Sequence, residues 1–266
     1  RYLMVSRNRI ILSCTYWAFV LYIFIPLILM IVMGFKDSKF IGFPIKSWTF
    51  DWYINIFSDY EIIYSFGYSI LIAIFSTLIS VIIGTWIAVL LEGRKFWGWS
   101  PVFGLMILPA LVPGIISAIA FRIYARWLGI EPGMGAIIWA HAVHNVPFVT
   151  IVVMARLSTL PKSQIEAARD LGADPLLTFI RITLPYLIPA ILGASIFCLL
   201  LSFDDFVRSF FLGDYNATLP VLIFAMLRSG MSPEINAIAT IALILTAAIG
   251  VWAERFTRKT NKDNSI

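Results

Sequence analysis

Six stretches of this chain run for nineteen or more residues without a single Asp, Glu, Lys or Arg side chain. An ionisable group at the centre of a bilayer costs about 2.5–3.5 kcal/mol, so such stretches predict membrane spans. Each has roughly the 20 residues that a helix needs to cross the hydrocarbon. The charge-free stretches are 10–35, 62–91, 96–121, 132–155, 182–203 and 235–253. Continuous apolar runs favour helices over barrel strands, so we expect an all-α integral membrane protein with six transmembrane helices.

The composition argues against a water-soluble enzyme. Apolar residues make up 60% of the chain and charged residues 13%, whereas soluble domains have about 45–50% and about 25%. The same hydrophobicity excludes a disordered chain. Because the sequence begins with arginine, not methionine, we expect a few residues to precede it.

The distribution of positive charge predicts the orientation in the membrane. With six spans both termini lie on one side, and the segments on that side carry 13 of the 20 Lys and Arg residues. Their net charge is +7, and the net charge of the opposite segments is −2. Cytoplasmic loops are enriched in Lys and Arg, so both termini are expected in the cytoplasm. The excess of Lys and Arg is therefore explained by the orientation in the membrane, and a nucleic-acid partner is not expected.

The loop between the fourth and fifth spans contains several helix-boundary signals. Ser163 and Glu166 have the spacing of a capping box, which predicts a short helix that ends at Gly172, a residue suited to the left-handed position after a helix. Asp174 and Pro175 then supply a second N-cap and a first-turn proline. The second helix is expected to run on toward residues 184–185.

A simple linker between two membrane helices would not require two capped helices joined by a sharp turn, an arrangement that we call the elbow. Small and apolar residues lie on or beside one side of its first helix: Ile165, Ala167, Ala168 and Leu171. Such an exposed apolar surface resembles one half of a helix-in-groove interface. The alternative is a helix lying on lipid, but five charges of both signs between residues 162 and 174 argue against burial in lipid.

The same loop carries a family resemblance. Residues 166–168 read EAA, Gly172 follows after three residues, and ITLP at 182–185 follows after nine more. This pattern resembles the EAA–G–I-LP loop of bacterial ABC importer permeases, at the same spacing. The resemblance implies a type I ABC importer permease fold with a cytoplasmic coupling helix between helices 4 and 5. It also implies a multi-pass protein of the bacterial cytoplasmic (inner) membrane.

The resemblance implies a division of the chain and a set of partners. Residues 65–255 would form the permease domain, after an N-terminal region at 1–64 and before a cytoplasmic tail at 256–266. Residues 163–173 would sit in a groove of an ATPase subunit. The implied partners are a second permease subunit that forms a heterodimer with this chain, two ABC ATPase subunits, an extracytoplasmic solute-binding protein and membrane lipid.

No catalytic role is expected for this chain. It contains no Gly-Lys pair and therefore no P-loop that could cradle nucleotide phosphates. ATP and magnesium would be bound by the partner ATPase subunits, and no cofactor by this chain. Two other classes remain as alternatives: an ion-coupled secondary transporter, which should carry coupling carboxylates within its spans, and a membrane scaffold.

Residues 202–206, with the sequence SFDDF, narrow the solute class. They resemble the S-x-D-D segment of spermidine/putrescine importer permeases, and residues 218–220 and 231–237 resemble further segments of that subfamily, in particular its second permease subunit. A polyamine is the implied solute, and another small nitrogen-containing solute, such as an amino acid derivative, is the alternative.

Asp204 and Asp205 close the fifth charge-free stretch, and carboxylates at a membrane edge are costly unless they face water, a partner or a solute. They could attract a cationic solute, and Phe203 and Phe206 could add cation–π contacts. The alternative is an ordinary helix end with Arg208 as counter-ion.

Polar and proline residues inside the spans give weaker signals. Asn145 is a pathway candidate, although an interhelical hydrogen bond explains it as well. His141 and His144 lack the third and fourth ligands of a zinc site, so no metal site is expected and hydrogen bonding is favoured. Pro109, Pro113 and Gly114 interrupt the third stretch, which predicts either a hinge for moving parts or a structural kink without motion.

Overall fold

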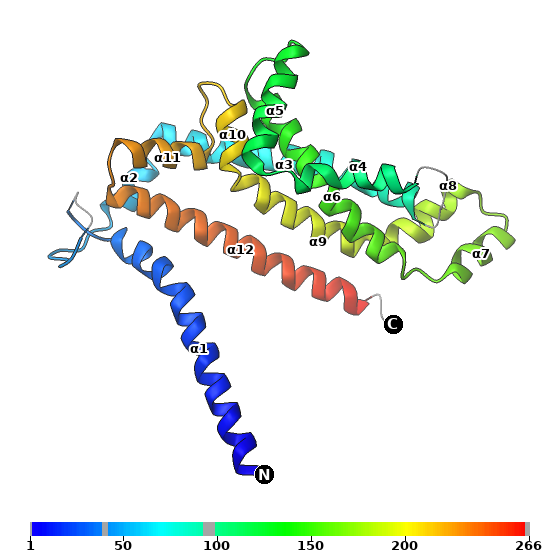
Figure 1. The fold of residues 1–266 in the computed structure, drawn as a ribbon, viewed down its shortest axis with the longest axis horizontal. Helices are drawn as coiled ribbons and strands as arrows, with labels where there is room; N and C mark the ends of the chain where they lie inside the picture. Colours follow the sequence, from blue (N-terminus) through cyan, green and yellow to red (C-terminus); the bar gives the residue numbers. More distant parts are fainter. Residues whose placement is uncertain (1, 39–41, 93–98, 264–266) are drawn as a thin grey trace. The chain divides into compact units, whose positions relative to one another are not determined.

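The computed structural model describes residues 2–38, 42–92 and 99–263, and within this part the chain is almost entirely helical (Figure 1). The helices are α1 (Tyr2–Met33), α2 (Asp51–Ile56), α3 (Tyr60–Leu91), α4 (Trp99–Leu111), α5 (Gly114–Trp127), α6 (Met134–Leu157), α7 (Lys162–Asp170), α8 (Pro175–Thr178), the π-helix η1 (Phe179–Thr183), α9 (Leu184–Phe203), α10 (Phe206–Leu212), α11 (Leu219–Ser229) and α12 (Pro233–Asp263). The all-α prediction is confirmed.

Five of the six expected spans are single helices that are long and apolar enough to cross a membrane. The third is a pair, α4 and α5, bent by 106° at the break between them. Pro113 causes the break, because it has no N–H to donate and takes an extended backbone with φ −52° and ψ 137°. The predicted interruption is therefore confirmed, and the bend is much sharper than a kink. The first residues of this expected span, 96–98, lie outside the described residues.

The chain folds into two compact units. The first comprises residues 1–63 and 223–245. In it Gly34, just after α1, is closely packed, because a Cβ placed there would lie 2.7 Å from the Tyr53 hydroxyl and 3.2 Å from the Ala237 amide nitrogen. The indole of Trp52 donates a hydrogen bond to the Lys36 carbonyl at 2.8 Å. These contacts fix the connection between α1 and α2.

The second unit comprises residues 64–222 and 246–266, and α6 is its best-buried span. Helix α9 runs beside α6, with α7 and α8 near one end of this pair and α5 and α10 near the other (Figure 1). One buried cluster between α3, α6 and α9 consists of Ala88, Val149, Val153, Leu187, Ala194 and Cys198. A second consists of Tyr68, Ile72, Ala136, Ile137, Ala140 and Leu212. Small residues in both clusters let the helix backbones approach closely.

Gly84 provides a test of this close packing of α3 on α6. A Cβ at this position would lie 2.7 Å from Cβ of Val149 and 3.1 Å from the Val146 carbonyl oxygen. We expect Gly84→Ala to destabilise the protein by about 1–3 kcal/mol, because overpacking forces the helices apart. Gly193→Ala is the matched control, since its Cβ would meet nothing within 4 Å. Thermal unfolding in detergent measures both variants, and equal midpoints would contradict the close approach.

Candidate functional site

The turn of the elbow (residues 162–178) has the geometry that the sequence predicts for the end of its first helix. Gly172 has φ +83°, a left-handed conformation that glycine adopts without strain. Its N–H donates to the Arg169 carbonyl at 2.9 Å, and the Ala173 N–H donates to the Ala168 carbonyl at 3.0 Å. These two bonds form a Schellman motif that ends α7.

The second half of the elbow begins as expected and then continues further than expected. The Asp174 carboxylate accepts a hydrogen bond from the Leu177 N–H at 2.6 Å, which caps α8 with Pro175 in its first turn. The helix does not end near residues 184–185. It passes through the π-helix η1 and continues as α9, so that one helical segment runs from Pro175 to Phe203. Pro185 lies in the first turn of α9, where its missing N–H is accommodated by the preceding π turn.

The predicted capping box is wrong. Helix α7 begins at Lys162, so Pro161 is the N-cap residue and no side chain caps this end. Ser163 therefore already lies inside the first turn, where its hydroxyl cannot act as the reciprocal partner of Glu166.

The predicted exposed apolar side of α7 is also only partly correct. Ala168 is buried and Ile165 is half-buried, because this side of α7 faces the ends of the neighbouring helices. Glu166 and Ala167 are exposed, and Leu171 at the tip of the elbow is 89% exposed. The most exposed apolar side chain of the elbow is therefore Leu171, followed by Leu176 at 64%.

The aspartate pair, Asp204 and Asp205, follows the other end of α9, and the two residues differ. The Asp205 carboxylate caps α10 by accepting the Arg208 N–H at 2.9 Å, and it forms an ion pair with the Arg208 guanidinium. His141 Nε2 lies 3.9 Å from the same carboxylate. Asp204 is exposed, and among the described residues its carboxylate has no hydrogen-bond or ion-pair partner.

The pKa values of the two carboxyl groups shift in opposite directions. Although Asp204 is exposed as a residue, partial desolvation of its carboxyl group and then the neighbouring Asp205 raise its pKa above the ordinary value. Burial acts in the same direction on Asp205, but His141 and Arg208 outweigh it, and the pKa of Asp205 is lowered. Asp205 is therefore held as a paired anion.

The two aromatic neighbours also differ. Phe203 is buried, with its ring centroid 6.3 Å from that of Phe66. Its ring therefore packs inside the protein beside Phe66. Phe206 is half-buried and lies with its ring centroid 5.3 Å from that of Phe210, which is exposed. A cation beside Asp204 would find Phe206 and Phe210 more accessible than Phe203.

Buried polar groups connect the aspartate pair to three helices. His141 Nδ1 is hydrogen-bonded to the Ser202 hydroxyl at 2.7 Å, and Ser202 to the Ser76 hydroxyl at 2.8 Å. His141 Nε2 lies 3.4 Å from the Ser209 hydroxyl. The network thereby joins α3, α6 and α9 to α10. Buried polar groups of this kind fix a unique arrangement when all of them are satisfied.

Two further polar residues of α6, His144 and Asn145, form interhelical hydrogen bonds. The Asn145 amide donates to the Cys198 carbonyl at 3.4 Å, and His144 Nδ1 donates to the Pro109 carbonyl at 3.2 Å. Within the described part of the chain, no three His, Cys, Asp or Glu side chains gather as metal ligands would. The predicted hydrogen-bonding role of both histidines is confirmed.

Sequence reasoning missed two features of the site. The serines of the polar network, Ser76 and Ser202, are single small polar residues in apolar stretches, a pattern that is common in membrane helices. Arg208 was considered as a counter-ion, but its burial was not predicted. Only its position three residues after Asp205 could have indicated a capped and paired helix start.

A bundle of apolar helices with a helical elbow between two spans agrees with the permease fold that the sequence predicts. Residues 80–263 match the family described as "Binding-protein-dependent transport system inner membrane component". The match covers more than half of the sequence. The chain belongs to this family, and it is therefore a multi-pass membrane protein of an inner-membrane transport class.

Similar proteins share this class. The chain is 32% identical over 245 residues to the spermidine/putrescine transport system permease protein PotC of Escherichia coli strain K12, covering 92% of each sequence. It is 33% identical over 240 residues to the putrescine transport system permease protein PotI of the same strain, covering 87% of this chain and 85% of the relative. The PotC protein of Haemophilus influenzae is 30% identical over 241 residues, covering 90% and 93%.

Solved structures show the same fold. A chain of a bacterial ABC transporter that imports alginate has a TM-score of 0.76 at 16% identity, covering 97% of this chain and 99% of that one. A chain of the inward-facing MetNI methionine ABC transporter has a TM-score of 0.64 at 21% identity, covering 73% and 93%. The predicted ABC importer permease fold is confirmed.

Proposed function

We propose that this chain is one transmembrane subunit of an ATP-driven importer of a polyamine. The observation that carries the solute class is the similarity, over about nine tenths of the chain, to permease proteins named for spermidine and putrescine. The unpaired carboxylate of Asp204 supports the same class, because a protonated amine is the ion that it would attract. The alternative solute is another small nitrogen-containing molecule.

The assembly would contain three kinds of protein partner. A second, related permease subunit would complete the pathway, two ATPase subunits would grip the elbows, and a solute-binding protein would deliver the polyamine from outside. Both termini would lie in the cytoplasm. ATP and magnesium would bind to the ATPase subunits, while this chain transmits movement and performs no chemistry of its own.

The helical segment from Pro175 to Phe203 gives this transmission a physical basis. It begins in the elbow and ends directly before the aspartate pair. Its 29 residues span roughly 40 Å. An ATPase subunit that shifts the elbow would tilt this segment and move Asp204 at the far end, as expected for rigid-body alternating access.

A reconstituted complex tests the proposed import function directly. Proteoliposomes that contain this chain, its partner permease and the ATPase subunits should take up spermidine or putrescine only when ATP and the binding protein are present. A panel of other small amines and amino acid derivatives separates the two solute classes. Uptake that proceeds without ATP would overturn the importer proposal.

Asp204→Asn tests which aspartate attracts the solute. We expect the polyamine concentration for half-maximal uptake to rise about tenfold, because a charge that attracts a protonated amine in a partly screened site contributes on this order. ATP hydrolysis by the complex should persist. Asp214→Asn is the control, since Asp214 is a carboxylate outside the aspartate pair whose side chain bonds to Asn216. An unchanged half-maximal concentration in the Asp204 variant would remove this residue from the solute pathway.

A further inference from the structure

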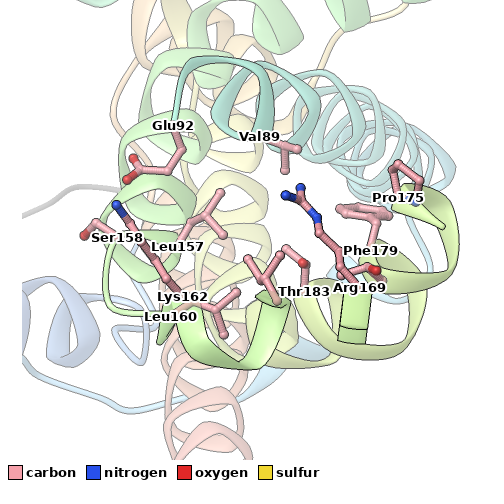
Figure 2. A pocket seen from close by; sticks show the side chains of 12 residues that line it. Val89, Glu92, Leu157, Ser158, Leu160, Lys162, Arg169, Pro175, Phe179 and Thr183 are labelled. Atoms are coloured by element: carbon pink, nitrogen blue, oxygen red, sulfur yellow. The ribbon is translucent and has the colours of Figure 1, made fainter. Parts of the chain in front are cut away.

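A pocket of about 370 Å³ lies between the elbow and the helix ends above it (Figure 2). Its lining comes from α3, the end of α6, α7, α8 and η1. The apolar part of the wall includes Val89, Leu157 and Phe179. Two cationic side chains, Lys162 and Arg169, also line it. A pocket with this mixed lining suits a ligand that has an anionic group and an apolar body.

The charges of the pocket are unevenly distributed. In Figure 2 Lys162 lies on the same side as Glu92, the one acidic residue among the described residues of the lining, whereas Arg169 extends its guanidinium toward Val89. Among the described residues, no carboxylate forms an ion pair with Arg169. A guanidinium has five donors in a fork that matches the oxygens of a phosphate. The Arg169 guanidinium is therefore available to bind an anion in the pocket.

A second, apolar groove of about 310 Å³ shares one lining residue with the pocket. Phe179 lines both, and the groove continues along α3 and α9 on side chains of the membrane-spanning segments. The groove residues are Val81, Ile82, Thr85, Trp86, Phe179, Leu184 and Ile191. The Trp86 ring stacks on that of Phe179, with the centroids 5.9 Å apart. A pocket with two cationic side chains is thus adjacent, at Phe179, to an apolar groove between two membrane-spanning segments.

We propose that the pocket and the groove together bind one anionic phospholipid, with its phosphate on Arg169 and an acyl chain along Val81, Ile82 and Ile191. Basic pockets between helices near the cytoplasmic membrane surface are known places for anionic head groups. The bound lipid would lie between α7 and the ends of α3 and α6, and so would support the elbow from the membrane side. This site does not depend on which solute is carried.

Native mass spectrometry of the full complex, purified in detergent and loaded with equal amounts of phosphatidylglycerol and phosphatidylcholine, tests the site. We expect retained phosphatidylglycerol in the wild type and about fivefold weaker retention in Arg169→Gln, since a surface Lys or Arg contributes about that factor to binding an anionic lipid. Arg181→Gln is the matched control, because Arg181 is an exposed cation of η1 outside the pocket. Equal loss in both variants, or no preference for phosphatidylglycerol, would overturn the proposal.

The groove has its own test. Ile82→Trp fills it, whereas Ile83→Trp places the same side chain on the neighbouring residue, which lies outside the groove lining. We expect only Ile82→Trp to reduce retention of phosphatidylglycerol. Retention that is unchanged in both variants would show that no acyl chain lies in the groove. Because the readout is bound lipid, these results stand whether or not polyamine uptake is observed.

Discussion

Replacing Leu171 by Asp is expected to weaken the binding of the ATPase subunits by about 30-fold. Leu171 is 89% exposed at the tip of the elbow, and a central side chain of an interface contributes about 2 kcal/mol or more when it is removed. An aspartate would in addition bring an unpaired charge into the contact. ATPase subunits that co-purify with the permease in detergent, quantified per permease chain, measure the effect.

The fold should survive this substitution, since an exposed side chain can be changed within about ±0.5 kcal/mol. Met231→Asp is the matched control, because Met231 is also apolar and 66% exposed but lies between α11 and α12, outside the elbow. If Leu171→Asp retains the ATPase subunits as well as Met231→Asp does, Leu171 does not dock a partner.

Replacing Asp205 by Ala is expected to lower the stability of the protein by about 3–5 kcal/mol. Its carboxylate pairs with the Arg208 guanidinium, and Arg208 is only 7% exposed. Removing one member of a buried ion pair leaves the other as an uncompensated buried charge. The alanine variant also loses the N-cap of α10, which contributes about 1 kcal/mol.

Asp205→Asn separates the two contributions. Asparagine can still cap α10, so this variant should be more stable than Asp205→Ala by about 1 kcal/mol while the loss of the charge pair remains. Asp204→Asn is the control and should unfold close to the wild type, because Asp204 is exposed and has no partner among the described residues. Thermal unfolding in detergent ranks the stability of the wild type and the three variants. A wild-type midpoint for Asp205→Ala would contradict the buried pair.

In the proposed function, the elbow and the far end of the helical segment that follows it therefore have separate roles. Leu171 is exposed in the elbow, and Asp204 lies at the far end beside the Asp205–Arg208 ion pair. Asp205→Ala should reduce the amount of folded protein, Leu171→Asp the bound ATPase, and Asp204→Asn the affinity for the solute. Because each variant changes a different measured quantity, an effect on stability can be distinguished from an effect on docking or transport.

Much of the fold could be predicted from the sequence because its signals are local. The length of each charge-free stretch sets a span, Pro113 breaks one of them, and Gly172 and Asp174 end one helix and begin the next through hydrogen bonds to residues at most five positions away. The capping box failed for a local reason as well, since Pro161 is the N-cap and the helix begins two residues earlier than it would with Ser163 as N-cap.

The sequence by itself determined the membrane class, the positions of the spans and the turn of the elbow, because hydrophobic length and backbone capping depend on residues that are close in the chain. Only the tertiary structure decided which of the two adjacent aspartates forms an ion pair, and which side of α7 is buried. His141 lies 64 positions before Asp205, and the pocket beside α7 is completed by residues of α3. Contacts over such separations depend on how whole helices pack.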